Sequence, residues 1–240
     1  MRPALPLLLL TAALGLRADG LSDLRSALRG LPASQPVKAS VDCQVWSRSG
    51  GGKQPKIVQG RAQARLEDGP AGLKLDWDRA ELDRVAAAEK AKDEGPGKAL
   101  QALGVERAER LTDAAKALLE DLDGAQVQED RPEAWQGHSA RLLVLKLEPK
   151  DLDADDRKHL KSFSRTLKVW LGPDGVPLAA AEQLDMKLSV MFIGVELHHA
   201  ESLAFARVGD RLVATHDEAQ DSGAGAGQQG DQRTVLDLKL

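Results

Sequence analysis

The residues of this sequence best suited to chemistry are two adjacent histidines with an acid close behind. His198, His199 and Glu201 fall in a segment whose apolar and polar residues alternate, which predicts a strand. Neighbouring residues of a strand point to opposite faces, so His198 and His199 cannot serve one site without a bulge. His199 and Glu201 share a face, where the carboxylate could orient the imidazole for acid–base work or metal binding. We favour the alternative that both lie at a strand end where the alternation is lost, because the sequence names no third partner.

One further carboxylate and the only thiol fall at positions predicted to be buried. Glu182 lies in the apolar phase of its strand, and a buried carboxylate needs a partner and is often functional. A bulge near Ala181 would instead turn Glu182 outward, and we favour the bulge. Cys43 shares a phase with Val41 and Val45. A nucleophilic thiol would need an activating group, so we predict that Cys43 is a small buried residue of the core.

The sequence contains none of the familiar motifs of catalysis or of metal and phosphate binding. No serine lies in a G-x-S-x-G motif, no glycine-rich loop follows a strand, and no Cys/His spacing fits zinc. The acidic run at 151–156 lacks the glycine and distal glutamate of a calcium-binding loop, so helix capping is the better interpretation. We therefore predict no catalytic residue, no metal ligand and no cofactor, and a protein that is not an enzyme.

The first eighteen residues have the layout of a secretory signal peptide. A basic start at Met1-Arg2-Pro3 is followed by the apolar run Ala4–Leu16, whose 13 residues are too few to span a membrane. No cysteine follows closely, so we expect no lipid anchor, and the composition favours the bacterial periplasm. Without residues 1–18 the net charge of −4 becomes −6, because Arg2 and Arg17 are lost. That mild acidity disfavours a nucleic-acid partner.

The remaining residues, 19–240, predict a single α+β domain that begins with a helix and a three-stranded meander. Leu21–Leu31 has the spacing of an amphipathic helix. Three segments then alternate between apolar and polar residues, as half-buried strands do: Val37–Trp46, Val58–Leu66 and Leu73–Trp77. Since turn residues join the last two, we expect these strands to be antiparallel.

Helices and a second, longer run of strands follow. Glu81–Glu94 and Leu100–Leu122 predict two helices separated by Gly95-Pro96-Gly97, and Gly172–Gly175 predicts a hairpin turn in a run of six or seven strands. The segment 217–232 is rich in Gly, Ala, Gln and Asp and predicts a flexible loop. The order of elements indicates an α+β fold with a long antiparallel sheet.

This layout resembles the LolA/LolB-like superfamily of periplasmic lipoprotein carriers. The resemblance is carried by the exported helix Leu21–Leu31, the meander 37–78, the midchain helices and the hairpin 167–176. It implies an unclosed antiparallel barrel whose concave face is covered by helices, with a hydrophobic cavity between the two layers for acyl chains. It also implies a hinge for the helical cover at Gly95-Pro96-Gly97.

One feature departs from that expectation. The second helix is highly charged, with acids and bases at 106–110, and the chain has only three Phe and three Met. Its cavity is therefore expected to be small or closed by its own side chains. If a cavity exists, the polar residues expected to face it are His199, Glu201 and Glu182.

The leading functional hypothesis is a soluble, exported, monomeric carrier for a lipid, an acylated protein or another amphiphile. The alternative is an envelope-stress sensor or scaffold that binds a protein partner through the same fold. A third hypothesis, a hydrolase or metal enzyme built around His199 and Glu201, has less support. These hypotheses differ in what the concave face of the sheet should hold.

Overall fold

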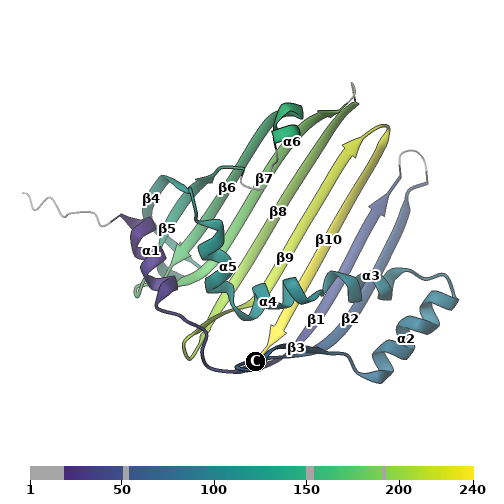
Figure 1. Cartoon of the computed structure of the whole chain (residues 1–240), viewed down its shortest axis with the longest axis horizontal. Coiled ribbons are helices and arrows are strands. Elements are labelled where there is room, and N and C mark those ends of the chain that lie inside the picture. Colours follow the sequence, from purple (N-terminus) through teal and green to yellow (C-terminus); the bar gives the residue numbers. More distant parts are fainter. Residues whose placement is uncertain (1–18, 51–53, 150–153, 191–192) are drawn as a thin grey trace, which may run out of the picture.

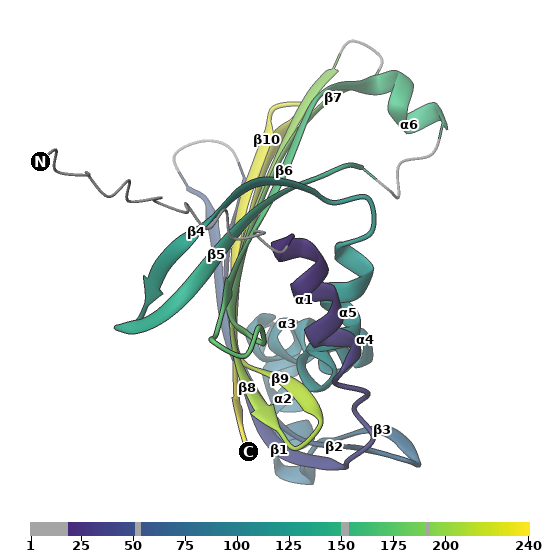
Figure 2. The ribbon, with the colours of Figure 1, turned by 90° about the vertical axis from the view of Figure 1, so that its left-hand side faces the viewer.

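A single ten-stranded antiparallel sheet organises the chain in the computed structural model, which describes residues 19–50, 54–149, 154–190 and 193–240 (Figure 1). The strand order is β3-β2-β1-β10-β9-β8-β7-β6-β5-β4, so the sheet begins at β3, ends at β4 and is not closed into a barrel. Helices α1 and α3–α5 lie on one side of it (Figure 2). The predicted α+β fold with a curved, unclosed antiparallel sheet is confirmed. The predicted signal peptide, residues 1–18, lies outside the described residues.

The elements have the following bounds. The helices are α1 (Gly20–Arg29), α2 (Arg79–Lys90), α3 (Gly95–Ala102), α4 (Val105–Thr112), α5 (Ala114–Asp121) and α6 (Ala154–His159). The strands are β1 (Val37–Ser49), β2 (Lys56–Gly69), β3 (Gly72–Asp76), β4 (Gln126–Trp135), β5 (His138–Leu147), β6 (Leu160–Leu171), β7 (Pro177–Val190), β8 (Ile193–Val208), β9 (Arg211–Gly225) and β10 (Gln228–Lys239).

The first three strands form the predicted meander. On β1 the side chains of Val37, Val41, Cys43 and Val45 are buried, whereas most of those between them are exposed or half-buried. β1 pairs with β2 and β2 with β3, both antiparallel. The other edge of β1 pairs with β10, so the N-terminal meander joins the C-terminal end of the chain.

The segment 217–232 is not a flexible loop, and that prediction is wrong. It belongs to the hairpin of β9 and β10, whose two-residue turn, Ala226-Gly227, has φ values of 51° and 77°. Positive φ at both central residues is the conformation that matches the twist of paired strands. The segment needs few apolar residues because both strands are central: β8 and β1 flank the hairpin and complete its backbone hydrogen bonds.

The helix predicted at Leu100–Leu122 is divided into three short helices, α3, α4 and α5. Gly104 and Asp113 stand at the N-caps of α4 and α5, and the Asp113 carboxylate accepts a hydrogen bond of 3.2 Å from the Lys116 amide. These breaks let the segment follow the curved sheet, with α3 packed on β1 and β2 and with α4 and α5 packed on β9.

Gly95-Pro96, expected to lie in a hinge, is instead a buried anchor at the start of α3. The backbone of Gly95 lies against that of Gly60 on β2, and a Cβ atom at either position would overlap the neighbouring backbone. Only glycine allows this approach. The contact fixes the helical layer to the sheet.

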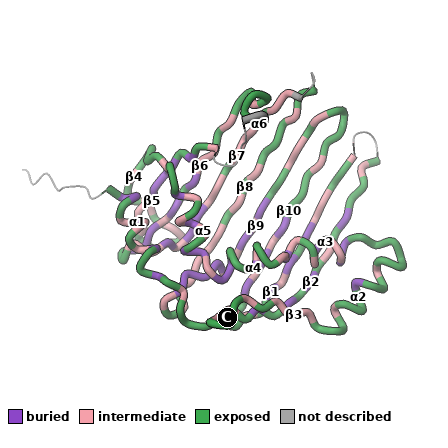
Figure 3. Tube along the Cα trace, viewed as in Figure 1, coloured by how far each residue is buried: buried purple, intermediate pink, exposed green. Residues whose placement is uncertain are grey.

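The hydrophobic core lies between the sheet and helices α1, α3, α4 and α5, and it is built largely from leucine. Burial is concentrated where α1 and α3–α5 cross the strands, whereas the ends of β7 and β8 that lie farthest from these helices are mainly intermediate or exposed (Figure 3). Cys43 is fully buried, as predicted. Within the described part of the chain, no helix is long and apolar enough to cross a bilayer.

Candidate functional site

An open groove crosses the concave face of the sheet beyond the helices. Its volume is about 530 Å³, and the apolar side chains along it are Leu184 and Met186 on β7 and Leu197 on β8. Met186 pairs with Leu197, and Leu197 pairs with Gly223 on β9, so these residues form one row across the strands. Leu197 retains 38% of its accessible surface, an unusual exposure for a leucine on the inner face of a sheet.

Glycines form part of the floor of the groove. Gly223 on β9 pairs with Gly230 on β10, in the same row as Leu197. A Cβ at Gly223 would come within 3.1 Å of the Leu197 side chain, and one at Gly230 would meet no atom closer than 3.5 Å. Neither glycine has positive φ, so both are compatible with an ordinary strand conformation. The missing side chain of Gly223 makes room for Leu197, and that of Gly230 leaves space above the sheet.

Polar groups line the side of the groove nearest the helices. His199 Nδ1 lies 2.7 Å from the Asp221 carboxylate on β9. Lys98 of α3 donates a hydrogen bond of 3.3 Å to the Ser47 hydroxyl on β1. This side therefore carries both an imidazole–carboxylate pair and an ammonium group, next to an apolar floor.

A cluster of charged side chains separates the groove from the packed core. We call it the charge cluster, and its members are Arg107 and Arg110 of α4, Asp121 of α5, Arg165 of β6, Glu182 of β7, Glu201 of β8 and Asp217 of β9. Arg107 donates two hydrogen bonds to Asp217, of 2.8 and 2.7 Å. Arg165 donates two to Glu182, of 2.7 and 2.9 Å, and a third, of 2.8 Å, to Asp121.

The bulge expected to turn Glu182 outward is not present at Ala181, and that prediction is wrong. The β7–β8 pairing runs in continuous register from Ala179 to Val190. Glu182 therefore keeps the inward phase of Ala180, and its side chain is only 10% exposed. The two hydrogen bonds from Arg165 satisfy this buried carboxylate, which explains why an acid is tolerated in an apolar phase.

His199 and Glu201 share the concave face, but they bind different partners. Glu201 lies 3.5 Å from Arg107 and 3.9 Å from Arg110, whereas His199 pairs with Asp221. His198 points to the other face, where its Nδ1 is 2.5 Å from Asp185. Both histidines thus sit in regular strand, and the expected loss of alternation does not occur.

Burial changes the proton affinity of two groups beneath α4. Burial, with the nearby Asp217 carboxylate, raises the pKa of Glu201 to about 7, against the attraction of Arg110, Arg107 and His199. Burial raises the pKa of the Cys43 thiol to about 12. A thiol with so high a pKa is protonated at neutral pH and is a poor nucleophile.

The cavity expected between the sheet and the helices is almost completely filled. The space enclosed by α4, α5 and the strands has a volume of about 20 Å³, roughly that of one water molecule. Apolar side chains line what remains of it, together with five members of the charge cluster: Leu111, Leu118, Leu167, Leu203 and Phe205, with Arg110, Asp121, Glu182, Glu201 and Asp217. The side chains of the protein itself close this space, as the charged second helix predicts.

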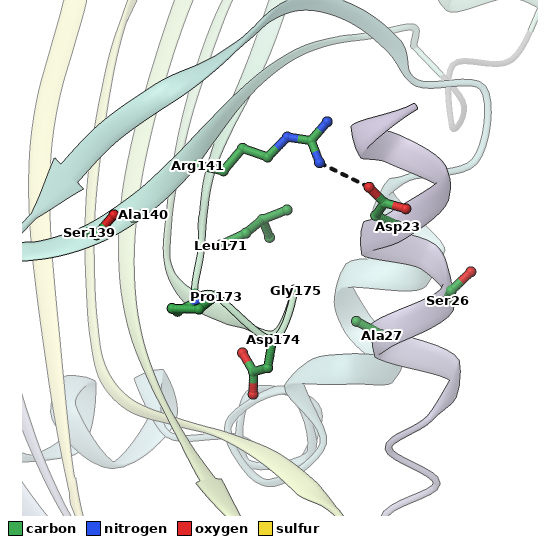
Figure 4. A pocket seen from close by; sticks show the side chains of 11 residues that line it. Asp23, Ser26, Ala27, Ser139, Ala140, Arg141, Leu171, Pro173, Asp174 and Gly175 are labelled. Atoms are coloured by element: carbon green, nitrogen blue, oxygen red, sulfur yellow. Dashed lines mark hydrogen bonds and ion pairs between the residues drawn. The ribbon is translucent and has the colours of Figure 1, made fainter. Parts of the chain in front are cut away.

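A second open pocket, of about 580 Å³, lies between α1 and the turn at Gly172–Gly175 (Figure 4). Its Arg141 donates two hydrogen bonds of 2.6 Å to Asp130 and one of 2.9 Å to Asp23 of α1. These contacts hold α1 against the end of the sheet, so the guanidinium group has a structural role in this pocket.

The sequence did not identify the arginines of the charge cluster as partners of the predicted acids. Arg107 and Arg110 were visible as charges on an amphipathic helix, but their pairing with β8 and β9 depends on the tertiary fold. In the part of the chain that the structure describes, no group of three or more His, Cys, Asp or Glu residues could hold a metal ion.

Comparison with known proteins yields one structural likeness. No protein family matches the sequence, and neither does any curated protein. Among solved structures, the chain is similar to that described as "Crystal structure of MucB in complex with MucA(peri)", at 10% identity and with a TM-score of 0.22. The match covers 92% of this chain and 93% of that chain. At this TM-score the likeness establishes neither a shared fold nor a shared partner.

Proposed function

We propose that this protein is a non-enzymatic binding protein, exported to the periplasm, that carries an amphiphile in the open groove of its concave face. The observation that supports this most directly is the contrast between two parts of one face. The part under α4 and α5 is filled, whereas the part beyond them leaves Leu184, Met186 and Leu197 facing an open groove. An apolar strip bordered by polar groups suits a ligand with a hydrocarbon tail and a polar head.

The groove could supply useful binding energy through its apolar residues. Each methylene group removed from water contributes about 0.8 kcal/mol, so a tail of roughly ten carbons contributes on the order of 8 kcal/mol before the cost of association. Lys98 offers a positive charge to an anionic head group at the side of the groove. A fatty acid or the acyl chain of a lipid or lipoprotein has this chemistry.

Filling the groove without changing its charge tests this function. Gly230→Val places a side chain on the groove floor, whereas Gly194→Val places one on the other face of the same end of the sheet, where a Cβ meets nothing within 4 Å. Fluorescence titration with a dansyl-labelled fatty acid should show binding to the native protein and to Gly194→Val. Binding to Gly230→Val should be at least about tenfold weaker, the equivalent of two lost methylene contacts.

Equal binding by all three proteins, or no binding by any of them, contradicts the proposal. Mass spectrometry of organic extracts from the purified native protein should also find an acylated molecule, which would identify the natural ligand.

A protein partner is the second candidate function, and the openness of the groove favours it. The groove lies along the surface rather than inside an enclosed cavity, so an apolar segment of an envelope protein could lie across the same strands. Under this alternative, Gly230→Val abolishes capture of an envelope protein, and organic extracts contain no acylated molecule. No catalytic step is assigned to either candidate.

A further inference from the structure

The charge cluster contains one more acid than base. The guanidinium groups of Arg107, Arg110 and Arg165 face four carboxylates. Asp217 and Glu182 each accept two hydrogen bonds from an arginine, and Asp121 accepts one. Glu201 is different, because its nearest cations are 3.5 and 3.9 Å away. Glu201 is therefore the carboxylate of the cluster to which no arginine donates a hydrogen bond, and it shares its two nearest cations with Asp217 and Asp121.

Glu201 is also held away from water, with 13% of its side chain exposed. Charged or titratable groups surround it from every element packed nearby. They are Arg107 and Arg110 from α4, Asp121 from α5, Arg165 from β6, Glu182 from β7, Asp217 from β9 and His199 from its own strand. With a proton on Glu201 the three cations balance three anions, whereas without it the cluster carries one uncompensated negative charge.

We propose that Glu201 is a proton-operated latch that holds the helical cover, α4 and α5, on the sheet. With Glu201 protonated, the charge cluster is balanced and the cover is closed. When Glu201 ionises, an unmatched charge lies between α4 and β8, and lifting the cover lets water reach it.

The latch would regulate access from the groove to the core, and in this respect it rests on the function proposed above. His199 and Leu184, which line the groove, lie two residues from Glu201 and Glu182 along their strands. On the other side of the cluster are Leu111, Leu118 and Leu203. Lifting the cover would therefore join the apolar strip of the groove to the apolar interior, and a longer hydrocarbon tail could enter.

The direction of the pH effect follows from the two states of Glu201. In the closed state the pKa is about 7, whereas an exposed glutamate has a value of 4.5. The closed state binds the proton more tightly, so raising the pH favours the open state. Between pH 6 and pH 8 the opening equilibrium constant should rise about tenfold.

Amide hydrogen exchange of the ligand-free, full-length protein tests the latch. Exchange in peptides that cover 105–121, corrected for the intrinsic effect of pH, should rise about tenfold in the native protein between pH 6 and pH 8. Glu201→Gln should exchange slowly and without this dependence. Glu196→Gln, on the same strand but with its carboxylate paired to Lys187 on the other face, should behave as the native protein does.

The latch is overturned if Glu201→Gln retains the tenfold rise, or if the native protein shows none. Arg110→Gln gives a second test that does not depend on altering Glu201. It removes a cation that favours the ionised form, so the midpoint of the rise should move to higher pH, and an unchanged midpoint contradicts the proposal.

Because these experiments contain no ligand, a protein that fails to bind the dansyl fatty acid would reject the carrier function and leave the latch standing.

Discussion

Gly60 of β2 and Gly95 of α3 meet backbone to backbone, which joins the helical layer to the sheet at one point. A Cβ at Gly60 would overlap the Gly95 carbonyl, and a Cβ at Gly95 would overlap the Gln59 carbonyl. Both clashes are with main chain rather than with a flexible side chain, so neither is relieved by a change of rotamer.

Gly60→Ala should therefore destabilise the protein by about 3 kcal/mol or more, at the upper end of the cost of overpacking. The matched control is Gly97→Ala in the same helix, where the nearest atom to a new Cβ is 3.9 Å away. That substitution should stabilise the protein by roughly 0.5–1 kcal/mol, because alanine is the better helix former. Urea denaturation measures the free energy of unfolding of both variants. Equal values would contradict the claim that the Gly60–Gly95 contact fixes the helical layer to the sheet.

Arg211 should be one of the side chains on which stability depends most. It is 4% exposed and donates hydrogen bonds of 2.5 Å to the Gln35 carbonyl, 2.5 Å to Asp68 and 3.2 Å to the Thr112 carbonyl. Arg211→Met leaves these acceptors without their donor, at a cost of about 3–5 kcal/mol in the free energy of unfolding.

The control for Arg211 is Arg233→Met, which breaks the ion pair of Arg233 with Glu218 at the surface. The Arg233 side chain is 54% exposed, so its loss should cost less than about 1 kcal/mol. Chemical denaturation should show a clearly larger loss in the free energy of unfolding for Arg211→Met than for Arg233→Met. Similar losses would show that the hydrogen bonds of Arg211 contribute no more to stability than a surface ion pair does.

Global stability should fall as the pH rises through the range set by Glu201. Its folded-state pKa, about 7, is above the ordinary value of 4.5, so the folded protein binds more protons than the unfolded chain between these values. The contribution of Glu201 is thus fully present below pH 4.5 and is lost as the pH rises through 7. The difference between native protein and Glu201→Gln, measured by urea denaturation from pH 5 to pH 8, should shift in favour of the variant. A constant difference would contradict this.

Cys43 provides a natural probe of the helical cover. It is fully buried on β1, and its pKa is raised to about 12, so a thiol reagent should react with it only when the structure opens. At neutral pH the labelling rate should be at least about a hundredfold below that of the urea-unfolded chain, and Glu201→Gln should label more slowly still. Rapid labelling of the folded native protein would show that the core under α4 is accessible without opening.

Local patterns predict much of the sheet, and long-range pairing decides the rest. The alternation from Val37 to Val45 correctly marks β1, because one face of that strand is apolar and the other polar. The same reasoning fails for 217–232. This segment forms regular strands because β8 and β1 pair with β9 and β10 on either side, and not because of its own apolar content.

In the candidate site, too, the local sequence predicts which residues are buried but not which residues they pair with. The phase of Glu182 correctly placed it among apolar residues, but its partner Arg165 lies on a neighbouring strand and could not be read from the local sequence. The sequence favours a bulge because burying an unpaired acid costs much free energy, and the hydrogen bonds from Arg165 remove that cost. Likewise, the glycines of the groove floor look like loop residues until the β9–β10 register places Gly223 opposite Gly230.

Methyl NMR of Met186 tests the central claim most directly. The chain has three methionines, so the methionine methyl spectrum is simple, and Met186 lies in the groove. Titration with dodecanoate should shift the methyl signals of Met186, Leu184 and Leu197 together, with one saturation curve. Ile57 should not shift, although it is 56% exposed, because it lies on the opposite face. Shifts of equal size at Ile57, or none at Met186, would contradict a binding groove on the concave face.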